Sequence, residues 1–163
     1  MNLVSQLAKR TAAAGRRWIR TSRARFMQRK RSHSVIVPIY PLTPEHVPEL
    51  KRHMLALSAQ DRYLRFGFAA NDEQIVRYID GLNFERDDIY GIFNRQLHLL
   101  AMAHVAILRE EGKEAMAEFG VSVASHARGR GYGARMFERA VMHARNEGVS
   151  LMFIHALSEN APM

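Results

Sequence analysis

A basic, glycine-rich segment carries the residue types of this chain that are best suited to binding chemistry. Its members are Arg128, Gly129, Arg130, Gly131, Tyr132, Gly133 and Ala134. Glycine lets the backbone turn tightly and expose its N–H groups, because no Cβ hinders a ligand or a left-handed conformation. From Tyr132 onward, apolar residues recur at helical spacing, so the loop opens into a helix N-terminus. Free N–H groups and the positive end of the helix dipole collect there, and the pattern therefore predicts a phosphate site.

An alternating segment, residues 118–124, precedes this loop. One face of the alternation holds Phe119, Val121 and Val123, and the other holds Glu118, Gly120, Ser122 and Ala124. A period of two residues is typical of a β-strand. The order of strand, glycine loop and helix therefore places the predicted anion site at the end of a sheet.

This arrangement resembles the GNAT superfamily of acyl-CoA-dependent N-acetyltransferases. Arg128, Gly131 and Gly133 occupy the fixed positions of that family's R/Q-x-x-G-x-G/A signature, and residues 121–123 match the (L/I/V)-x-V strand before it. The resemblance implies acetyl-CoA as co-substrate and an amine as acceptor. The residues that it implies for acetyl-CoA are Val121, Ser122, Val123, Arg128, Gly129, Arg130, Gly131, Tyr132, Gly133, Ala134 and Asn160.

The implied chemistry is direct acetyl transfer to an amine, which must be neutral to attack and so needs a base or a water chain. By resemblance to members with a base on the motif strand, Glu118 is the candidate. The alternative is that Glu118 is an edge-facing surface carboxylate on a half-solvated strand. The backbone N–H of Val123 is expected to polarise the thioester carbonyl and stabilise its oxyanion. Val121 and Val123 are expected to pair with the pantetheine arm.

Two other interpretations of the loop stay open. Gly129, Gly131 and Ala134 also satisfy the dinucleotide fingerprint G-x-G-x-x-G/A. The position of the loop near the C-terminus, and the absence of a well-placed later acid for a ribose, argue against it. The loop could also be a tight turn that binds nothing, although a simple reversal of the chain does not require three glycines and two arginines.

The composition limits the function classes. With 163 residues, of which 47% are hydrophobic and 25% charged, the chain can form one domain and a tail. It has no cysteine, which excludes disulfides, thiolate nucleophiles and cysteine-based metal sites. The eight histidines show no H-E-x-x-H pattern and no carboxylate-paired cluster, so no metal is expected. No apolar run approaches the roughly 18 residues of a membrane span. We expect a cytoplasmic protein.

Positive charge is concentrated at the N-terminus. The first 31 residues hold ten of the 24 Lys and Arg residues and none of the 16 acids, so the pI of about 10.4 describes a tail. We divide the chain into this tail, 1–33, and a domain, 34–163. The tail has three interpretations: a solvated extension, a basic amphipathic helix for a membrane surface or nucleic acid, or an organellar targeting peptide. Met27 as the true start would remove most of it.

The expected element order is β-α-α-β-β-β-α-β. We place strands at 34–40, 88–93, 97–108, 118–124 and 151–156, and helices from 43 to about 57, from Asn71 and from Tyr132, with Thr43 as an N-cap. The strand at 151–156 is expected to be buried. The fold class is α/β (α+β), a mixed, mostly antiparallel sheet flanked by helices. Arg62 and Arg65 lie between the two early helices, in what resembles a substrate-side region, and either face an anionic acceptor or are solvated charges.

The resemblance also implies a further helix and two strands after this order, and residues 158–163 resemble only the start of that helix. We therefore expect an incomplete domain, weakly active or inactive, that can form a homodimer through the apolar strand at 151–156. Two alternative functions follow. One is an acyl-CoA-binding regulatory module without turnover, and the other is an adaptor whose basic tail contacts a membrane or nucleic acid.

Overall fold

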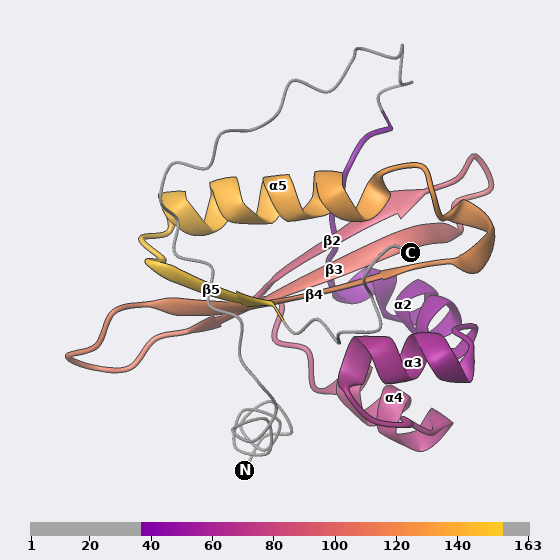
Figure 1. The fold of residues 1–163 in the computed structure, drawn as a ribbon, viewed down its shortest axis with the longest axis horizontal. Helices are drawn as coiled ribbons and strands as arrows, with labels where there is room; N and C mark the ends of the chain where they lie inside the picture. Colours follow the sequence, from indigo (N-terminus) through magenta and orange to yellow (C-terminus); the bar gives the residue numbers. More distant parts are fainter. Residues whose placement is uncertain (1–36, 155–163) are drawn as a thin grey trace.

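The computed structural model describes residues 37–154 (Figure 1). Its elements are β1 (Tyr40–Pro41), η2 (Pro44–His46), α2 (Val47–Leu55), α3 (Ala59–Phe66), α4 (Asp72–Asp80), β2 (Asp88–Phe93), β3 (Leu99–Leu108), β4 (Met116–Val123), η3 (Ser125–Ala127), α5 (Tyr132–Asn146) and β5 (Leu151–Ile154). The predicted tail and Asn160 lie outside the described residues. No helix between residues 37 and 154 is long and apolar enough to cross a membrane.

One five-stranded sheet organises the fold, with strands in the order β1-β2-β3-β4-β5. The first three pairings are antiparallel, and only β4 and β5 are parallel. A parallel pair needs a crossover connection, which α5 provides. Helix α5 lies on one side of the sheet, and α2, α3 and α4 gather on the other (Figure 1). The predicted fold class, a mostly antiparallel sheet flanked by helices, is confirmed.

Each face of the sheet buries its own apolar cluster. Met136, Ala140 and Ala144 of α5 pack with Phe119 of β4 on one side. On the other side, the cluster includes Leu50, Met54, Ile75, Ile79 and Met102. Burial of large side chains on both faces fixes the register of β3 and β4, because a shift of one residue would exchange the faces. Each side chain of β4 in the candidate site is therefore fixed on one particular face of the sheet.

The two predicted early helix starts are confirmed. The Thr43 N–H donates to His46 Nδ1 at 3.1 Å. Asn71 and Gln74 form a reciprocal box, in which the side-chain oxygen of each residue accepts the backbone N–H of the other at 2.9 and 3.0 Å. Such contacts satisfy N–H groups that a helix cannot bond internally.

Helix α3 is a helix that the sequence reasoning missed. Ser58 caps its start by accepting the Asp61 N–H at 3.1 Å, and Gly67 ends it in a left-handed conformation, with φ of 76°. Arg62 then ties the helix to its surroundings through three backbone carbonyls and one carboxylate, those of Leu55, Leu57, Ala70 and Asp72. Tertiary contacts thus stabilise a helix of eight residues that would be marginal alone.

Two predicted strands differ from the structure. The strand expected at 34–40 is wrong over residues 37–39, because β1 is only Tyr40–Pro41. Pro38 and Pro41 lack the N–H that a ladder needs, which limits pairing here. The strand at 151–156 forms as β5 over residues 151–154, but it is half-buried rather than buried. It lies at the edge of the described sheet and pairs with β4 alone.

Candidate functional site

The glycine loop between η3 and α5 has the conformation that its sequence predicts. Gly129 and Gly131 take left-handed φ angles of 74° and 76°, and Gly131 is the N-cap of α5. Gly133 lies in the first turn of α5 without a positive φ. A Cβ added at any of these three positions would meet nothing within 4 Å, so open space lies beside the loop. Glycine is therefore favoured at 129 and 131 by the left-handed backbone conformation of these two positions.

The N-terminus of α5 presents backbone donors to this space. The amides of Tyr132, Gly133 and Ala134 lie in the first turn, where a helix offers them no internal acceptor. No acidic side chain occupies that turn. The 15-residue helix therefore directs the positive end of its dipole at the loop, a setting that favours a phosphate. Tyr132 contributes only backbone to it, since its side chain is buried in the core below α5.

A second set of backbone groups lies along one edge of β4. Ala124 donates its N–H to the Leu100 carbonyl at 2.8 Å, and thus bonds toward β3. Antiparallel alternation then directs the N–H and C=O groups of Val123 and Val121 toward the opposite edge. On that edge β5 pairs with β4 only as far as Phe119. Within residues 37–154, no strand covers the peptide groups of Val121 and Val123, which lead directly to the glycine loop.

The side chains of the motif strand separate as the alternation predicts. Val121 and Val123 pack against the cluster on the α5 side. Ser122 is buried on the other face, where its hydroxyl contacts His53 Nε2 at 2.9 Å and Met54 Sδ at 3.3 Å. By the same alternation the peptide groups of Ser122 bond toward β3, so neither its hydroxyl nor its backbone faces the β4 edge of Val121 and Val123.

Arg128, the first residue of the signature, is half-exposed and pairs with Asp61 of α3. The pKa of the Asp61 carboxyl is lowered below its ordinary value. Burial opposes its ionisation, but hydrogen bonds from Ser58 and Arg128 outweigh that effect. The pair links the glycine loop to α3. Arg130, by contrast, is exposed.

Glu118 lies on the face of β4 that is turned toward α3 and α4. It is half-buried on a strand that lies between β3 and β5. Burial raises the pKa of Tyr78, and the charge of Glu118 raises it further. Buried polar groups from α3, α4, β3 and the residue before β2 lie on that face.

Those groups form a hydrogen-bonded chain, which we call the acceptor-face network: Arg65, Tyr78, Asp87 and His104. Arg65 Nη2 donates to the Tyr78 hydroxyl at 2.7 Å, and the hydroxyl contacts His104 Nδ1 at 2.8 Å. His104 Nε2 lies 3.1 Å from Asp87 Oδ2. Burial opposes ionisation of Asp87, but hydrogen bonds from His104 and Arg86 lower its pKa to about 2. Sequence reasoning missed this network because its members come from four separate parts of the chain.

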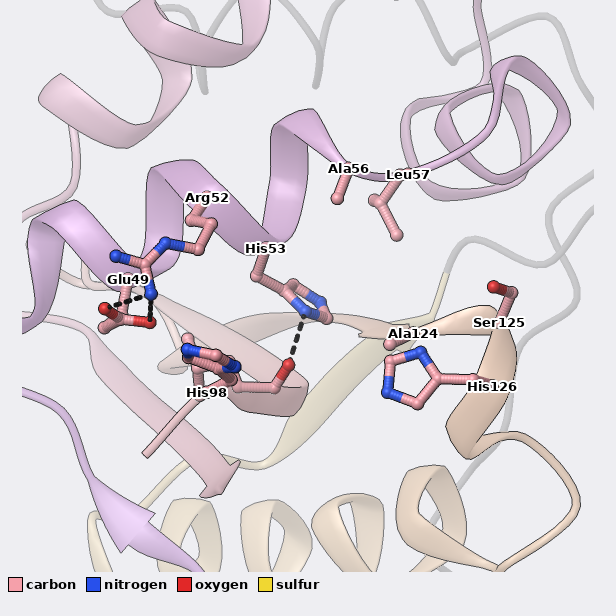
Figure 2. Close-up of a pocket in the computed structure, with 10 residues that line it drawn as sticks. Glu49, Arg52, His53, Ala56, Leu57, His98, Ala124, Ser125 and His126 are labelled. Atoms are coloured by element: carbon pink, nitrogen blue, oxygen red, sulfur yellow. Dashed lines mark hydrogen bonds and ion pairs between the residues drawn. The ribbon is translucent and has the colours of Figure 1, made fainter. Parts of the chain in front are cut away.

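A hollow of about 200 Å³ opens where α2 meets the end of β4 (Figure 2). Figure 2 shows His53, His98 and His126 around it, beside the ion pair of Glu49 and Arg52. His53 is buried and contacts the Leu99 carbonyl through Nδ1 at 3.3 Å. Burial lowers the pKa of His53. In the part of the chain that the structure describes, no group of three or more His, Asp or Glu residues could hold a metal ion.

The fold thus combines a sheet with one parallel pair, a crossover helix and a glycine loop at the start of that helix. Residues 38–163 match the Acetyltransferase (GNAT) family, and the chain belongs to this family. No curated protein matches the chain.

Solved structures support the same fold. The chain is similar to the GNAT domain of S. lividans PAT, with 18% identity and a TM-score of 0.60, over 75% of this chain and 73% of that one. It is similar to glucosamine-6-phosphate N-acetyltransferase from Arabidopsis thaliana, with 18% identity and a TM-score of 0.54, over 77% and 86%. A predicted acetyltransferase from Clostridium acetobutylicum, determined with acetyl-CoA, has 14% identity and a TM-score of 0.59, over 78% and 85%. At these identities the likeness shows the fold alone.

Proposed function

We propose that this protein is an N-acetyltransferase, which transfers the acetyl group of acetyl-CoA to the amine of an acceptor. One observation carries the proposal: the peptide groups of Val121 and Val123, which no strand within residues 37–154 covers, lead into a left-handed glycine loop at a helix N-terminus. A matching ligand has amide groups, which can bond to the peptide groups of Val121 and Val123, followed by a pyrophosphate, which can bind at the start of α5. Acetyl-CoA is such a molecule, and the open space beside the loop accommodates its phosphates.

Each set of groups has a role in this proposal. The amides at residues 132–134 bind the pyrophosphate. The edge of β4 pairs with the pantetheine arm as an added strand would. The N–H of Val123 polarises the thioester carbonyl, and one such donor contributes about 3 kcal/mol to stabilising the transition state.

Glu118 is the proposed base. As the amine nitrogen forms its bond to the acetyl carbon, it loses a proton, which the Glu118 carboxylate takes directly or through one water. The carbon–sulfur bond breaks, and the CoA thiolate that is released takes a proton from solvent to become the thiol. The half-buried position of Glu118, on the same face as Arg65 and Tyr78, supports this role.

The test is binding and turnover of acetyl-CoA by the full chain. Acetyl-CoA should raise the thermal midpoint, and a panel of amines should release free thiol. Gly131→Asp should abolish both responses, because it places a carboxylate at the anion site. Gly112→Asp is the matched control, since Gly112 has a φ of 73° and open space beside it but lies in the turn between β3 and β4.

The outcomes separate the alternatives. A chain that binds acetyl-CoA but acetylates no amine would be the regulatory module. If Gly131→Asp and Gly112→Asp respond to acetyl-CoA equally well, the glycine loop is not the anion site.

A further inference from the structure

Arg65 lies directly on the backbone of the motif strand. A Cβ added at Gly120 would overlap its guanidinium carbon and both terminal nitrogens. Gly120 precedes Val121, the first residue of the uncovered β4 edge, and stands opposite His104 of β3. Glycine at this position therefore makes room for a cation beside the place where the proposed function puts the reacting groups.

The two arginines of α3 differ in how their donors are used. Arg62 donates to three carbonyls and pairs with Asp72, so its donors hold the fold together. Arg65 donates to the Tyr78 hydroxyl alone among the residues in 37–154, and its buried Nε has no partner there. Its charge lies 5.2 Å and 5.4 Å from the ring centres of Phe66 and Tyr78. Within the same range, no carboxylate forms an ion pair with it.

The acceptor-face network fixes the position of Arg65. A guanidinium can only donate, so the Tyr78 oxygen accepts from Arg65; with a neutral His104 protonated at Nε2, the Tyr78 O–H donates to His104 Nδ1. The N–H at His104 Nε2 then donates to Asp87, whose other oxygen accepts the Ile107 amide at 3.3 Å. In this arrangement the Tyr78 O–H and the His104 N–H each donate to a neighbour, whereas Arg65 Nε has no partner within residues 37–154. The network therefore holds a cation in a fixed position.

We propose that Arg65 is an acceptor-recognition residue that binds an anionic group, a carboxylate or a phosphate, on the amine that is acetylated. The inference rests on the proposed function and deepens it. A guanidinium presents a planar set of donors that suits both anions. Glu118 lies on the same face of β4, so an acceptor with an ammonium group and an anionic group meets complementary charges there.

The experiment compares matched acceptors. Alanine and alaninamide test the carboxylate, and phosphoethanolamine and ethanolamine test the phosphate, each at equal concentration of neutral amine. The anionic member of at least one pair should have the higher kcat/KM. Arg65→Gln should lower that value by about 10- to 100-fold, mainly through KM, and change the neutral member by less than about threefold, because one charge-assisted contact is lost.

Two more variants separate recognition from folding. Gly120→Ala leaves Arg65 in the chain but displaces its flexible end, so it should reproduce the loss for the anionic acceptor. Arg77→Gln is the matched control, because Arg77 is an exposed arginine of α4 whose one ion-pair partner within residues 37–154 is Glu73. Arg77→Gln should change the kcat/KM of neither member of an acceptor pair.

Where an acceptor pair shows no turnover, binding is measured by the thermal midpoint with CoA present. The anionic member should then raise the midpoint of the parent and not of Arg65→Gln. The inference is overturned if neither assay prefers an anionic amine, or if Arg65→Gln affects both members equally. Acetyl-CoA binding is measured separately for the same variants, because a failure to bind acetyl-CoA would contradict the proposed function and not the role of Arg65.

Discussion

The glycine loop and the acceptor-face network are two polar regions built in opposite ways. The loop presents backbone amides from consecutive residues, 132–134, and its conformation depends on two left-handed glycines. The network presents side chains from α3, α4, β3 and the residue before β2, and Asp87 and His104 are buried within it. A site built from backbone depends on conformation and hardly on side-chain identity. A site built from side chains depends on every partner, because each removal leaves a buried polar group unsatisfied.

Glu118→Gln tests the side-chain region with the largest expected effect. If Glu118 is the base, kcat at neutral pH should fall by about 10²- to 10⁴-fold, while the affinity for acetyl-CoA stays the same. Raising the pH should partly restore the rate, because the amine then loses its proton without help. Steady-state pH–rate profiles measure this, with the exposed Glu138→Gln of α5 as the control. A profile identical to the parent's would remove Glu118 from the mechanism.

Asp87→Asn should break the network and spare the loop. Removing one partner of a buried charged pair costs about 3 kcal/mol or more, so urea unfolding should show a loss of that order. The carboxyl has a folded pKa of about 2 against an ordinary value of 3.8. Its contribution is therefore complete above about pH 4 and is lost as the pH falls toward 2. Parent and variant should converge in stability over that range. Equal stability at pH 7 would contradict the described contacts.

Arg128→Gln should have the smallest effect. The side chain is half-exposed and already pairs with Asp61, so its loss should weaken acetyl-CoA binding by only about two- to fivefold. Titration calorimetry can measure the change. A loss as complete as that expected for Gly131→Asp would mean that the arginine side chain, and not the backbone, binds the pyrophosphate.

The sequence predicts the loop region well because its signals are local. Alternation in β4, the glycine spacing and the helical period of α5 all fall within residues 116–146. The hairpin of β2 and β3 and the caps at Thr43 and Asn71 are short-range features of the same kind.

The acceptor face could not be predicted in the same way. Arg65 and His104 are 39 positions apart, and only the packing of α3 and α4 on the sheet joins them through Tyr78. Helix α3 itself is eight residues long with three charged side chains, a weak signal without its tertiary contacts. The length of β1 depends on pairing with β2, which the apolar run at 34–40 does not specify.

The central claim is that the uncovered edge of β4 and the start of α5 bind acetyl-CoA through backbone groups. Amide hydrogen exchange, resolved by residue with and without acetyl-CoA, tests it most directly. Exchange should slow at Val121, at Val123 and at residues 132–134. The Ala124 amide, already bonded to Leu100, should not change. If acetyl-CoA binds but exchange at Val123 stays the same, the β4 edge is not its site.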